Sequence, residues 1–599
     1  MPKMQAQQQA ENVSDLSNLY ADIARKSGQL LTQYIERGQN GGLPGLNDDL
    51  GIAQAFFQAW SQLLTDPLKL AEAQMRFWQD SMTLWQSSML RLMGQNSGPV
   101  AEPLPGDRRF KHEDWQQNFL YDYIRQSYLI AARHLHQTLG KVEGLDEQTA
   151  RKVDFYTRQY IDALSPSNFL LTNPEVMRET VASGGQNLVK GLANLLEDLS
   201  RGGGQLRLRM TDEKAFRLGE NIATTPGSVV FQNDLIQLIQ YAPAGEQVYR
   251  RPLLVIPPWI NKYYILDLRE SNSFVKWATE QGHTVFVVSW VNPDKKLAHK
   301  RFDDYLTEGV LAALDAIEKA TGEREANVIG YCLGGTLLAC ALGYLAAKKD
   351  ERIASATFFA SLIDFSEAGE LEVFIDEGQV AALEKRMNER GYLEGSEMAT
   401  TFNMLRSNDL IWSFVVSNYL LGRDPFPFDL LYWNSDSTRM PAAMHSFYLR
   451  TMYIKNLLAQ PGGVELAGVP IDLTRVKTPL YFVSTVEDHI APWRSTYAGA
   501  KCFTGPVRFV LGGSGHIAGI VNPPAGGKYS YWTNPKLPAT PEAWQKGAQQ
   551  HAGSWWPDWA KWVAPHSGDK VPARVPGKGK LKVIEAAPGA YARMRADKG

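Results

Sequence analysis

Cys332 lies between two glycines, where the sequence changes from a short apolar run to a Leu- and Ala-rich stretch. The run is long enough for a buried strand, and the stretch after it is typical of a helix. Gly330 and Gly334 permit a turn so tight that a side chain at either position would collide with its neighbours. Such a turn aims the first helix amides at the sulfur, where they stabilise a thiolate and an oxyanion. The pattern predicts a nucleophilic cysteine; the alternative is a buried cysteine in a glycine-rich turn.

The chain also supplies an acid and a base that could serve such a cysteine. Asp488 follows the apolar run 480–484, and His516 follows the run 508–511. Both runs are typical of buried strands, and open parallel sheets hold their sites at the carboxyl ends of the strands. Nucleophile, acid and base occur in this chain order in enzymes that carry the nucleophile on a strand-to-helix turn. Cys332, Asp488 and His516 therefore form a candidate catalytic triad.

Two neighbouring residues offer alternatives for these roles. His489 adjoins Asp488, and because adjacent residues usually point apart it is the weaker candidate for the base. Glu487 could replace Asp488 as the acid, and spacing alone leaves that choice open. Cys340 lies in the expected helix and is predicted to be core, while Cys502 belongs to no motif. The histidines show no spacing that predicts a metal site.

An acyl-transfer site also needs two N–H donors for the oxyanion. The amide of Leu333, directly after the nucleophile, is the first candidate. The second donor normally comes from a loop that follows an earlier strand, here residues 256–264. Two prolines stiffen this loop and remove competing donors, so the amide of Ile260 or Asn261 is the second candidate. The alternative is a rigid turn without a donor role.

Strand-like and helix-like segments alternate through the part of the chain that carries these residues. Such alternation predicts an α/β fold, with a mostly parallel sheet covered by helices on both faces. A hairpin is expected at its start, where two apolar runs flank a short polar turn. Besides the run before Cys332, the strand-like runs are residues 229–231, 235–239, 253–256, 284–288, 353–359, 480–484 and 508–511.

The alternation also predicts the domain organisation. Residues 205–566 form the expected catalytic domain, and residues 366–460 within it, rich in aromatics and without a clear strand, are the expected helical cap. Residues 51–204 carry helical periodicity and predict an all-α N-terminal domain. Residues 1–50 are polar and expected to be partly disordered. Residues 567–599 are expected to form a basic, flexible tail.

One helical segment of the N-terminal part has a wide apolar face rich in tryptophan and methionine. The favoured interpretation is a core face of the helical domain. The alternative is an exposed surface that meets a hydrophobic partner. The face consists of Met75, Phe77, Trp78, Met82, Trp85, Met89, Leu92 and Met93.

Composition excludes several classes of protein. The chain has 599 residues, too many for one core, so at least two domains are expected. A net charge of −2 argues against nucleic acid as the main partner. Three cysteines suggest no disulfide framework and fit a reducing compartment. The N-terminus lacks the apolar core of a signal peptide, and no apolar run is long enough for a membrane span, so a cytoplasmic protein is expected.

Four segments together resemble the polyhydroxyalkanoate synthases. They are residues 257–268, 330–335, 488–493 and 513–516. The similarity runs from about residue 110 to 565, and the Gly-Tyr-Cys-Leu-Gly-Gly form, the length and the helical N-terminal part resemble the class I, short-chain type. The resemblance implies an α/β-hydrolase fold preceded by a helical domain.

The resemblance also implies roles and partners. Cys332 would be the nucleophile and acyl carrier, with Asp488, rather than Glu487, and His516 as its partners. The enzyme would be an acyltransferase that polymerises (R)-3-hydroxyacyl-CoA, such as 3-hydroxybutyryl-CoA, and releases CoA, without a further cofactor. It would act as a homodimer at the surface of polymer granules, where granule-associated proteins are possible partners.

Two other functions compete with this one. A thioesterase or polyester depolymerase would use the same fold with water as the acceptor. A non-catalytic granule-coat protein would use the apolar N-terminal helices to cover polymer. A coat protein would survive the loss of Cys332, whereas an enzyme would not.

Overall fold

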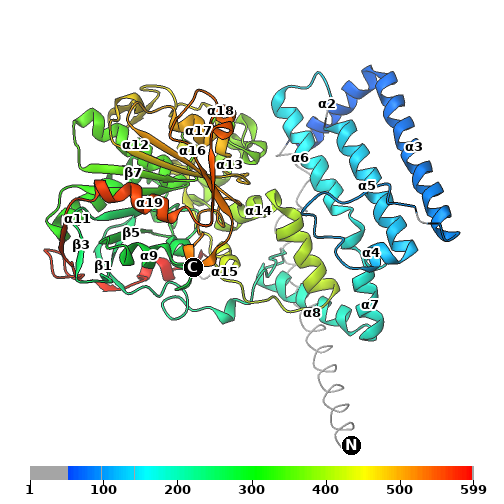
Figure 1. Cartoon of the computed structure of the whole chain (residues 1–599), viewed down its shortest axis with the longest axis horizontal. Coiled ribbons are helices and arrows are strands. Elements are labelled where there is room, and N and C mark those ends of the chain that lie inside the picture. The colour runs from blue at the N-terminus through cyan, green and yellow to red at the C-terminus, as the bar shows by residue number, and fades with distance from the viewer. Residues whose placement is uncertain (1–50, 96, 141, 205, 597–599) are drawn as a thin grey trace, which may run out of the picture. The chain divides into compact units, whose positions relative to one another are not determined.

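The computed structural model describes residues 51–95, 97–140, 142–204 and 206–596 (Figure 1). The chain divides into two compact units. The first extends to Asp212 and also includes residues 402–426, and the second contains residues 213–401 and the chain from 427 onward. The segment 1–50, expected to be partly disordered, lies outside the described residues.

The first unit is helical. Side chains cap several of its helices: Asp66 accepts a hydrogen bond from the Lys69 amide at the start of the longest one, and Asn118 and Asp146 act similarly. The long helices α3 and α5 pack side by side (Figure 1). The helices are α2 (Ile52–Thr65), α3 (Pro67–Leu92), α4 (Asp114–Gln117), α5 (Phe119–Leu139), α6 (Glu147–Ala163), α7 (Pro174–Ala182) and α8 (Gln186–Arg201).

Residues 402–426 belong with these helices, which corrects the expectation that residues 366–460 form one cap on the catalytic domain. The segment contains the π-helical turns η7 (Asn408–Trp412) and η8 (Val415–Leu420). Polar side chains join it to α8, since Asn194 Nδ2 donates to the carbonyl of Asn418. These pairings join residues more than 200 positions apart, so no local pattern in the sequence reports them.

The second unit is built on an 11-stranded sheet within the described residues. Its six central strands, β13, β12, β7, β6, β4 and β5, run parallel to one another, and antiparallel strands extend both edges. The predicted hairpin is present as β1 and β2. In sheet order the strands are β15 (Gln549–Ala552), β14 (Ser530–Thr533), β13 (Val507–Gly512), β12 (Leu480–Thr485), β7 (Ile353–Phe359), β6 (Ala326–Tyr331), β4 (Leu253–Ile256), β5 (Val285–Trp290), β2 (Ile236–Tyr241), β1 (Gly227–Gln232) and β17 (Glu585–Ala586).

Both faces of this sheet are buried, as predicted for a parallel sheet between helices. Along β4, Leu254 and Ile256 join one hydrophobic core, while Leu253 and Val255 join the other. The short strands outside the sheet are β3 (Gln247–Tyr249), β8 (Tyr392–Leu393), β9 (Met440–Pro441), β10 (Val464–Leu466), β11 (Val469–Ile471) and β16 (Lys570–Pro572).

The helices of this unit lie between and beyond the strands. They are α9 (Phe274–Glu280), α10 (Phe302–Asp304), η5 (Tyr305–Leu311), α11 (Ala312–Thr321), α12 (Leu333–Lys348), α13 (Glu377–Arg390), α15 (Asp429–Ser435), α16 (Ala442–Tyr448), η9 (Leu449–Ile454), α17 (Trp493–Ala500), α18 (Pro541–Lys546), α19 (Trp556–Val563) and α20 (Ala590–Arg593). Helix α14 (Gly395–Leu405) crosses the division between the two units. Short 3-10 turns connect several of these elements, among them η3 (Tyr263–Asp267).

The tryptophan- and methionine-rich face of α3 is exposed, so its interpretation as a core face is wrong. Trp78 is 61% exposed and Trp85 49% exposed. The buried residues of α3 are Leu84 and Ser88, which belong to a narrower stripe than the sequence pattern indicates. In the described part of the chain, α3 included, no helix combines the length and apolar character needed to cross a membrane.

The segment 567–596 is packed on the second unit, which corrects the expectation of a flexible tail. Strand β16 pairs with β3, and β17 pairs with β1 at the edge of the sheet. The ammonium group of Lys262, 3% exposed, donates to the carbonyls of Tyr591 at 3.0 Å and Met594 at 2.7 Å. Burial lowers the pKa of Lys262 to about 8. The polar, basic composition of this segment predicted mobility. Composition does not reveal that its strands pair with β1 and β3, or that its carbonyls accept hydrogen bonds from the buried Lys262.

Deletion of residues 585–599 should therefore destabilise the second unit. It uncovers the edge of β1 and leaves the Lys262 ammonium group buried without its two acceptors, at a cost of about 1–3 kcal/mol or more. Chemical denaturation measures the loss, and removal of residues 597–599 alone is the control. Lys262→Met should add little to the deletion, because both changes remove the same contact. An unchanged denaturation midpoint in the longer deletion would contradict this account.

Candidate active site

Cys332 occupies the turn between β6 and α12. Its backbone has φ 53° and ψ −121°, a conformation that non-glycine residues rarely adopt and that costs about 1–3 kcal/mol. The amide of Cys332 donates to the carbonyl of Phe359 at the end of β7, at 2.8 Å. The neighbouring strand thus holds the strained residue in place. Strain of this kind persists where the surroundings fix the geometry, and it is concentrated at functional sites.

The glycines around Cys332 are required by close packing. A Cβ atom on Gly330 would lie 2.5 Å from the Cα atom of Gly335. One on Gly334 would lie 2.8 Å from the carbonyl oxygen of Pro257 and closer still to that of Ile256. The first turn of α12 therefore rests directly on the backbone that leaves β4, which brings the loop after β4 to the nucleophile.

Helix α12 starts at Leu333, so Cys332 stands at the N-terminus of a 16-residue helix. The amides of Gly335 and Thr336 donate to the carbonyl of Cys332. The partial positive charge at this helix end favours a thiolate and an oxyanion. The Leu333 amide, directly after Cys332, stays the predicted first oxyanion donor.

The loop after β4 is held by the segment that follows α15. Thr438 donates its amide to the carbonyl of Ile260 at 2.8 Å, and Asn261 forms a β-bridge with Ser437. The Asn261 side chain donates to the carbonyl of Trp433. These contacts make the loop rigid, whereas the choice between the Ile260 and Asn261 amides as second donor stays a prediction.

His516 and Asp488 meet at the carboxyl ends of β13 and β12. The distance from His516 Nδ1 to Asp488 Oδ2 is 2.7 Å, and the Asp488 side chain is fully buried. The amides of Ile490 and Ala491 donate to Asp488 Oδ1 at 2.9 and 2.8 Å. The carboxylate therefore accepts hydrogen bonds on both oxygens and orients the imidazole, as the base of a triad requires.

The electrostatics of His516 join it to the nucleophile. Burial acts to lower its pKa, but the charges of Asp488 and Cys332 and hydrogen bonds to both raise the pKa of His516 well above its usual range. The Tyr331 hydroxyl donates to the backbone carbonyl of His516 at 3.0 Å. The structure thus brings together all three residues of the predicted triad.

The alternative residues lie in different environments. Glu487 is exposed, and Asp488 is the carboxylate that binds the imidazole of His516. His489 accepts at its backbone carbonyl from the Glu370 amide. Burial raises the pKa of the Cys340 thiol, as the core position predicted, and raises that of Cys502 to about 11. Neither thiol has an environment that favours a thiolate.

Two tyrosines near Cys332 were not predicted from the sequence. Burial and the nearby charge of Cys332 both raise the pKa values of Tyr448 and Tyr453. Both lie in the aromatic segment that the sequence assigned to a cap. The π-helical geometry of η9, which no pattern in the sequence indicates, brings the two rings into contact.

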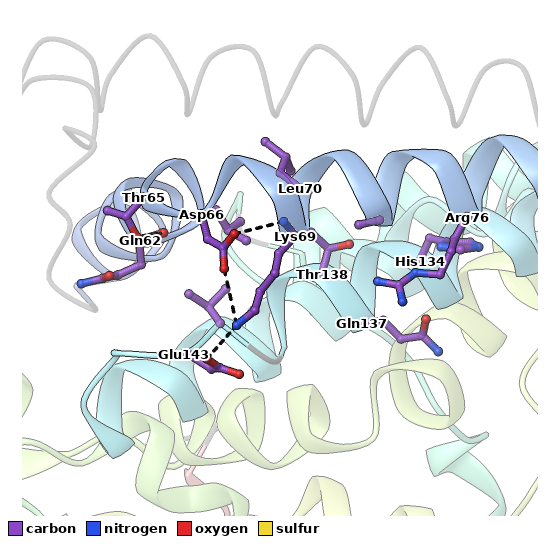
Figure 2. Close-up of a pocket in the computed structure, with 13 residues that line it drawn as sticks. Gln62, Thr65, Asp66, Lys69, Leu70, Arg76, His134, Gln137, Thr138 and Glu143 are labelled. Atoms are coloured by element: carbon purple, nitrogen blue, oxygen red, sulfur yellow. Dashed lines mark hydrogen bonds and ion pairs between the residues drawn. The ribbon is translucent and has the colours of Figure 1, made fainter.

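A separate cavity of about 250 Å³ lies among α2, α3 and α5 of the helical unit (Figure 2). None of its lining residues belongs to the candidate triad. Its Lys69 ammonium lies 2.8 Å from Glu143 and 3.6 Å from Asp66. Two carboxylates already neutralise this cation, so the charge at Lys69 does not indicate an anion site.

Gly334→Ala should disrupt the turn at Cys332. The new methyl group would meet the backbone carbonyls of Ile256 and Pro257, and backbone cannot move aside as a side chain can. The expected result is a melting temperature lowered by several degrees, together with a loss of Cys332 alkylation by iodoacetamide. Gly245→Ala is the matched control, because nothing lies within 4 Å of its Cβ position. Equal behaviour of the two variants would contradict the packing argument.

His516 should remain protonated above pH 6.5. Since Asp488 and Cys332 raise its pKa, the imidazolium form persists at pH values where an ordinary histidine is neutral. Asp488→Asn removes a charge that raises the pKa of His516 and should lower the midpoint of its titration. NMR titration of ¹³C-labelled histidines, with the signal assigned through His516→Gln, measures it, and His551→Gln is the control. A His516 midpoint at or below 6.5 in the unsubstituted protein would refute the prediction.

Comparison with known proteins agrees with this arrangement. Residues 106–278 match the family described as the N-terminus of poly-beta-hydroxybutyrate polymerase (PhaC), and residues 257–523 match the alpha/beta hydrolase fold. The second match confirms the predicted fold class.

The chain is also similar to curated proteins along most of its length. It is 49% identical to a poly(3-hydroxyalkanoate) polymerase of Methylorubrum extorquens, with 98% of each chain covered. It is 53% identical to the poly(3-hydroxyalkanoate) polymerase subunit PhaC of Rhizobium meliloti, covering 89% of this chain and 87% of that one. Identity to the corresponding Cupriavidus necator protein is 43%, covering 93% and 92%. The chain is therefore an enzyme of the poly(3-hydroxyalkanoate) polymerase family.

Proposed function

We propose that this enzyme builds polyhydroxyalkanoate from (R)-3-hydroxyacyl-CoA, with short-chain units such as 3-hydroxybutyryl-CoA, through an acyl group carried on Cys332. The observation that carries the proposal is the alignment of a cysteine at a helix N-terminus with a histidine that is bound to a buried carboxylate. Family membership supports the polymerisation of hydroxyalkanoate units.

The first step is acylation of the cysteine. The Cys332 thiolate attacks the thioester carbonyl, and the oxyanion that forms is held by the Leu333 amide and by Ile260 or Asn261. Collapse of this intermediate forms the new carbon–sulfur bond and breaks the bond to CoA. CoA leaves as a thiolate, which takes the proton of the His516 imidazolium. The acyl group stays activated because a thiolate is a good leaving group.

The second step transfers the acyl group to a hydroxyl. His516, now neutral, removes the proton from the 3-hydroxyl of another unit as its oxygen attacks the acyl-Cys332 carbonyl. An ester forms, the bond to Cys332 breaks, and the cysteine is regenerated as a thiolate beside the imidazolium. Repetition lengthens the polyester. The reaction as proposed draws only on the thioester bond.

The enzyme is also proposed to work as a homodimer at the surface of polymer granules. The exposed tryptophan and methionine side chains of α3 support contact with an apolar surface, because large exposed apolar patches mark interaction sites. They do not distinguish polymer from another protein chain. Granule-associated proteins would be further partners at the same surface.

One assay separates this function from its competitors. Purified enzyme is given 3-hydroxybutyryl-CoA, and free CoA, turbidity and enzyme in the polymer pellet are followed together. CoA release with turbidity and co-sedimentation is expected. CoA with soluble acid would indicate a thioesterase, and absence of both products a coat protein.

Variants test the residue roles in the same assay. Cys332→Ala should abolish CoA release and leave the fold intact, whereas Cys340→Ala should retain activity. His516→Gln should lose about 100-fold or more in rate, the usual scale for a general base, and His489→Gln should lose far less. Retained activity in Cys332→Ala, or a larger loss from His489→Gln, would overturn the assignments.

A further inference from the structure

A π-helical turn brings Tyr448 and Tyr453 onto one face of their segment. Tyr448 ends α16, and η9 follows it with hydrogen bonds of the i to i−5 type, such as Lys455 N to Arg450 O at 3.2 Å. In an α-helix, side chains five residues apart would diverge by about 140°. In the π-helical turn the two rings contact, with centroids 5.6 Å apart and planes at 84°. Such turns are rare and frequent at functional sites.

The tyrosine pair is fixed from the side of the sheet. Phe365 contacts both rings, with centroids 6.1 Å from Tyr448 and 4.9 Å from Tyr453. The side chain of Asn456 accepts a hydrogen bond from the Phe365 amide at 2.8 Å and donates one to Asp364 at 2.9 Å. Phe365 and Asp364 lie in the loop after β7, and Phe359 at the end of β7 accepts a hydrogen bond from the Cys332 amide. One strand therefore positions both the nucleophile and the pair.

A residue of helix α12 provides a second observation on where Tyr448 and Tyr453 lie. Thr336 lies four residues after Cys332, a spacing that places two positions on the same side of a helix. Burial raises the pKa of Tyr448, and Tyr453, Cys332 and Thr336 are among the groups that act on it in addition. Burial, followed by the charge of Cys332, also raises the pKa of Tyr453. Two phenols whose electrostatics include Cys332 thus lie together in aromatic surroundings.

The mechanism above does not use these hydroxyls. An acyl group on Cys332 presents its carbonyl oxygen to the oxyanion amides, and its next polar atom is the oxygen on carbon 3. A buried tyrosine hydroxyl finds a hydrogen-bonding partner, and a site built to bind a hydroxyl discriminates against a ligand that lacks one.

We propose that Tyr448 and Tyr453 bind the 3-oxygen of the acyl unit as it is loaded onto Cys332, and so select 3-hydroxyacyl groups over unsubstituted acyl groups. This inference rests on the proposed acyl-cysteine route. It adds no covalent step: the thioester bond to CoA breaks and the thioester bond to Cys332 forms as before. The hydrogen bond lowers the barrier only for substrates with an oxygen at carbon 3.

The test is a single-turnover measurement of CoA release from enzyme in excess over ester, with (R)-3-hydroxybutyryl-CoA and with butyryl-CoA. The unsubstituted enzyme should load the hydroxy ester at least about 100-fold faster. Tyr453→Phe should slow loading of the hydroxy ester about 10-fold to 100-fold and change the rate with butyryl-CoA by less than about threefold. Tyr448→Phe should act in the same direction, which keeps the test decisive if one variant folds poorly.

Tyr497→Phe is the matched control, because this buried tyrosine donates to the carbonyl of Pro538 and its pKa is raised by burial alone. It should leave the ratio of the two rates unchanged. If the tyrosine variants load both esters more slowly by the same factor, the inference is overturned. Tyr448 and Tyr453 would then only hold Cys332 in position. An unchanged ratio in both tyrosine variants would also overturn it. If neither ester loads the unsubstituted enzyme, the acyl-cysteine route is overturned, and the inference with it.

Discussion

The close approach of α12 to the end of β4 is the constraint on which the site depends. Because glycine has no Cβ atom, the helix can begin directly after Cys332 and rest at Gly334 on the carbonyls of Ile256 and Pro257. That contact brings the first turn of α12 and the loop after β4 together at Cys332. The positive φ of Cys332 is a cost of this arrangement, and the hydrogen bond from its amide to β7 offsets part of it.

A second balance concerns charge. Removing an imidazolium and a carboxylate from water is costly, and the geometry must supply enough hydrogen bonds to compensate. Asp488 receives them from His516 and from the amides of Ile490 and Ala491. Each residue of the site is thereby held by groups from a different strand end. The parallel sheet provides the common edge at which these groups meet.

The sequence predicted what short segments determine. Apolar runs located the central strands, glycine spacing located the turn at Cys332, and chain order located Asp488 and His516. Prediction from the sequence failed where contacts between distant segments determine the structure. Residues 402–426 pack with the helical unit, and the basic tail is paired with β1 and β3. Tyr448 and Tyr453 were missed because five-residue spacing does not suggest a shared face in an ordinary α-helix. The apolar stripe of α3 was misread because periodicity does not reveal whether a partner covers it.

The contact between Lys262 and residues 591–594 has a consequence for biosynthesis. More than 300 residues separate its two sides. At usual rates of translation the segment leaves the ribosome roughly half a minute after Lys262 does. During that interval the edge of β1 is open, and a cation that the finished fold buries is still hydrated. The strand that leads to Cys332 is therefore synthesised well before residues 591–594 can hold the loop that follows β4.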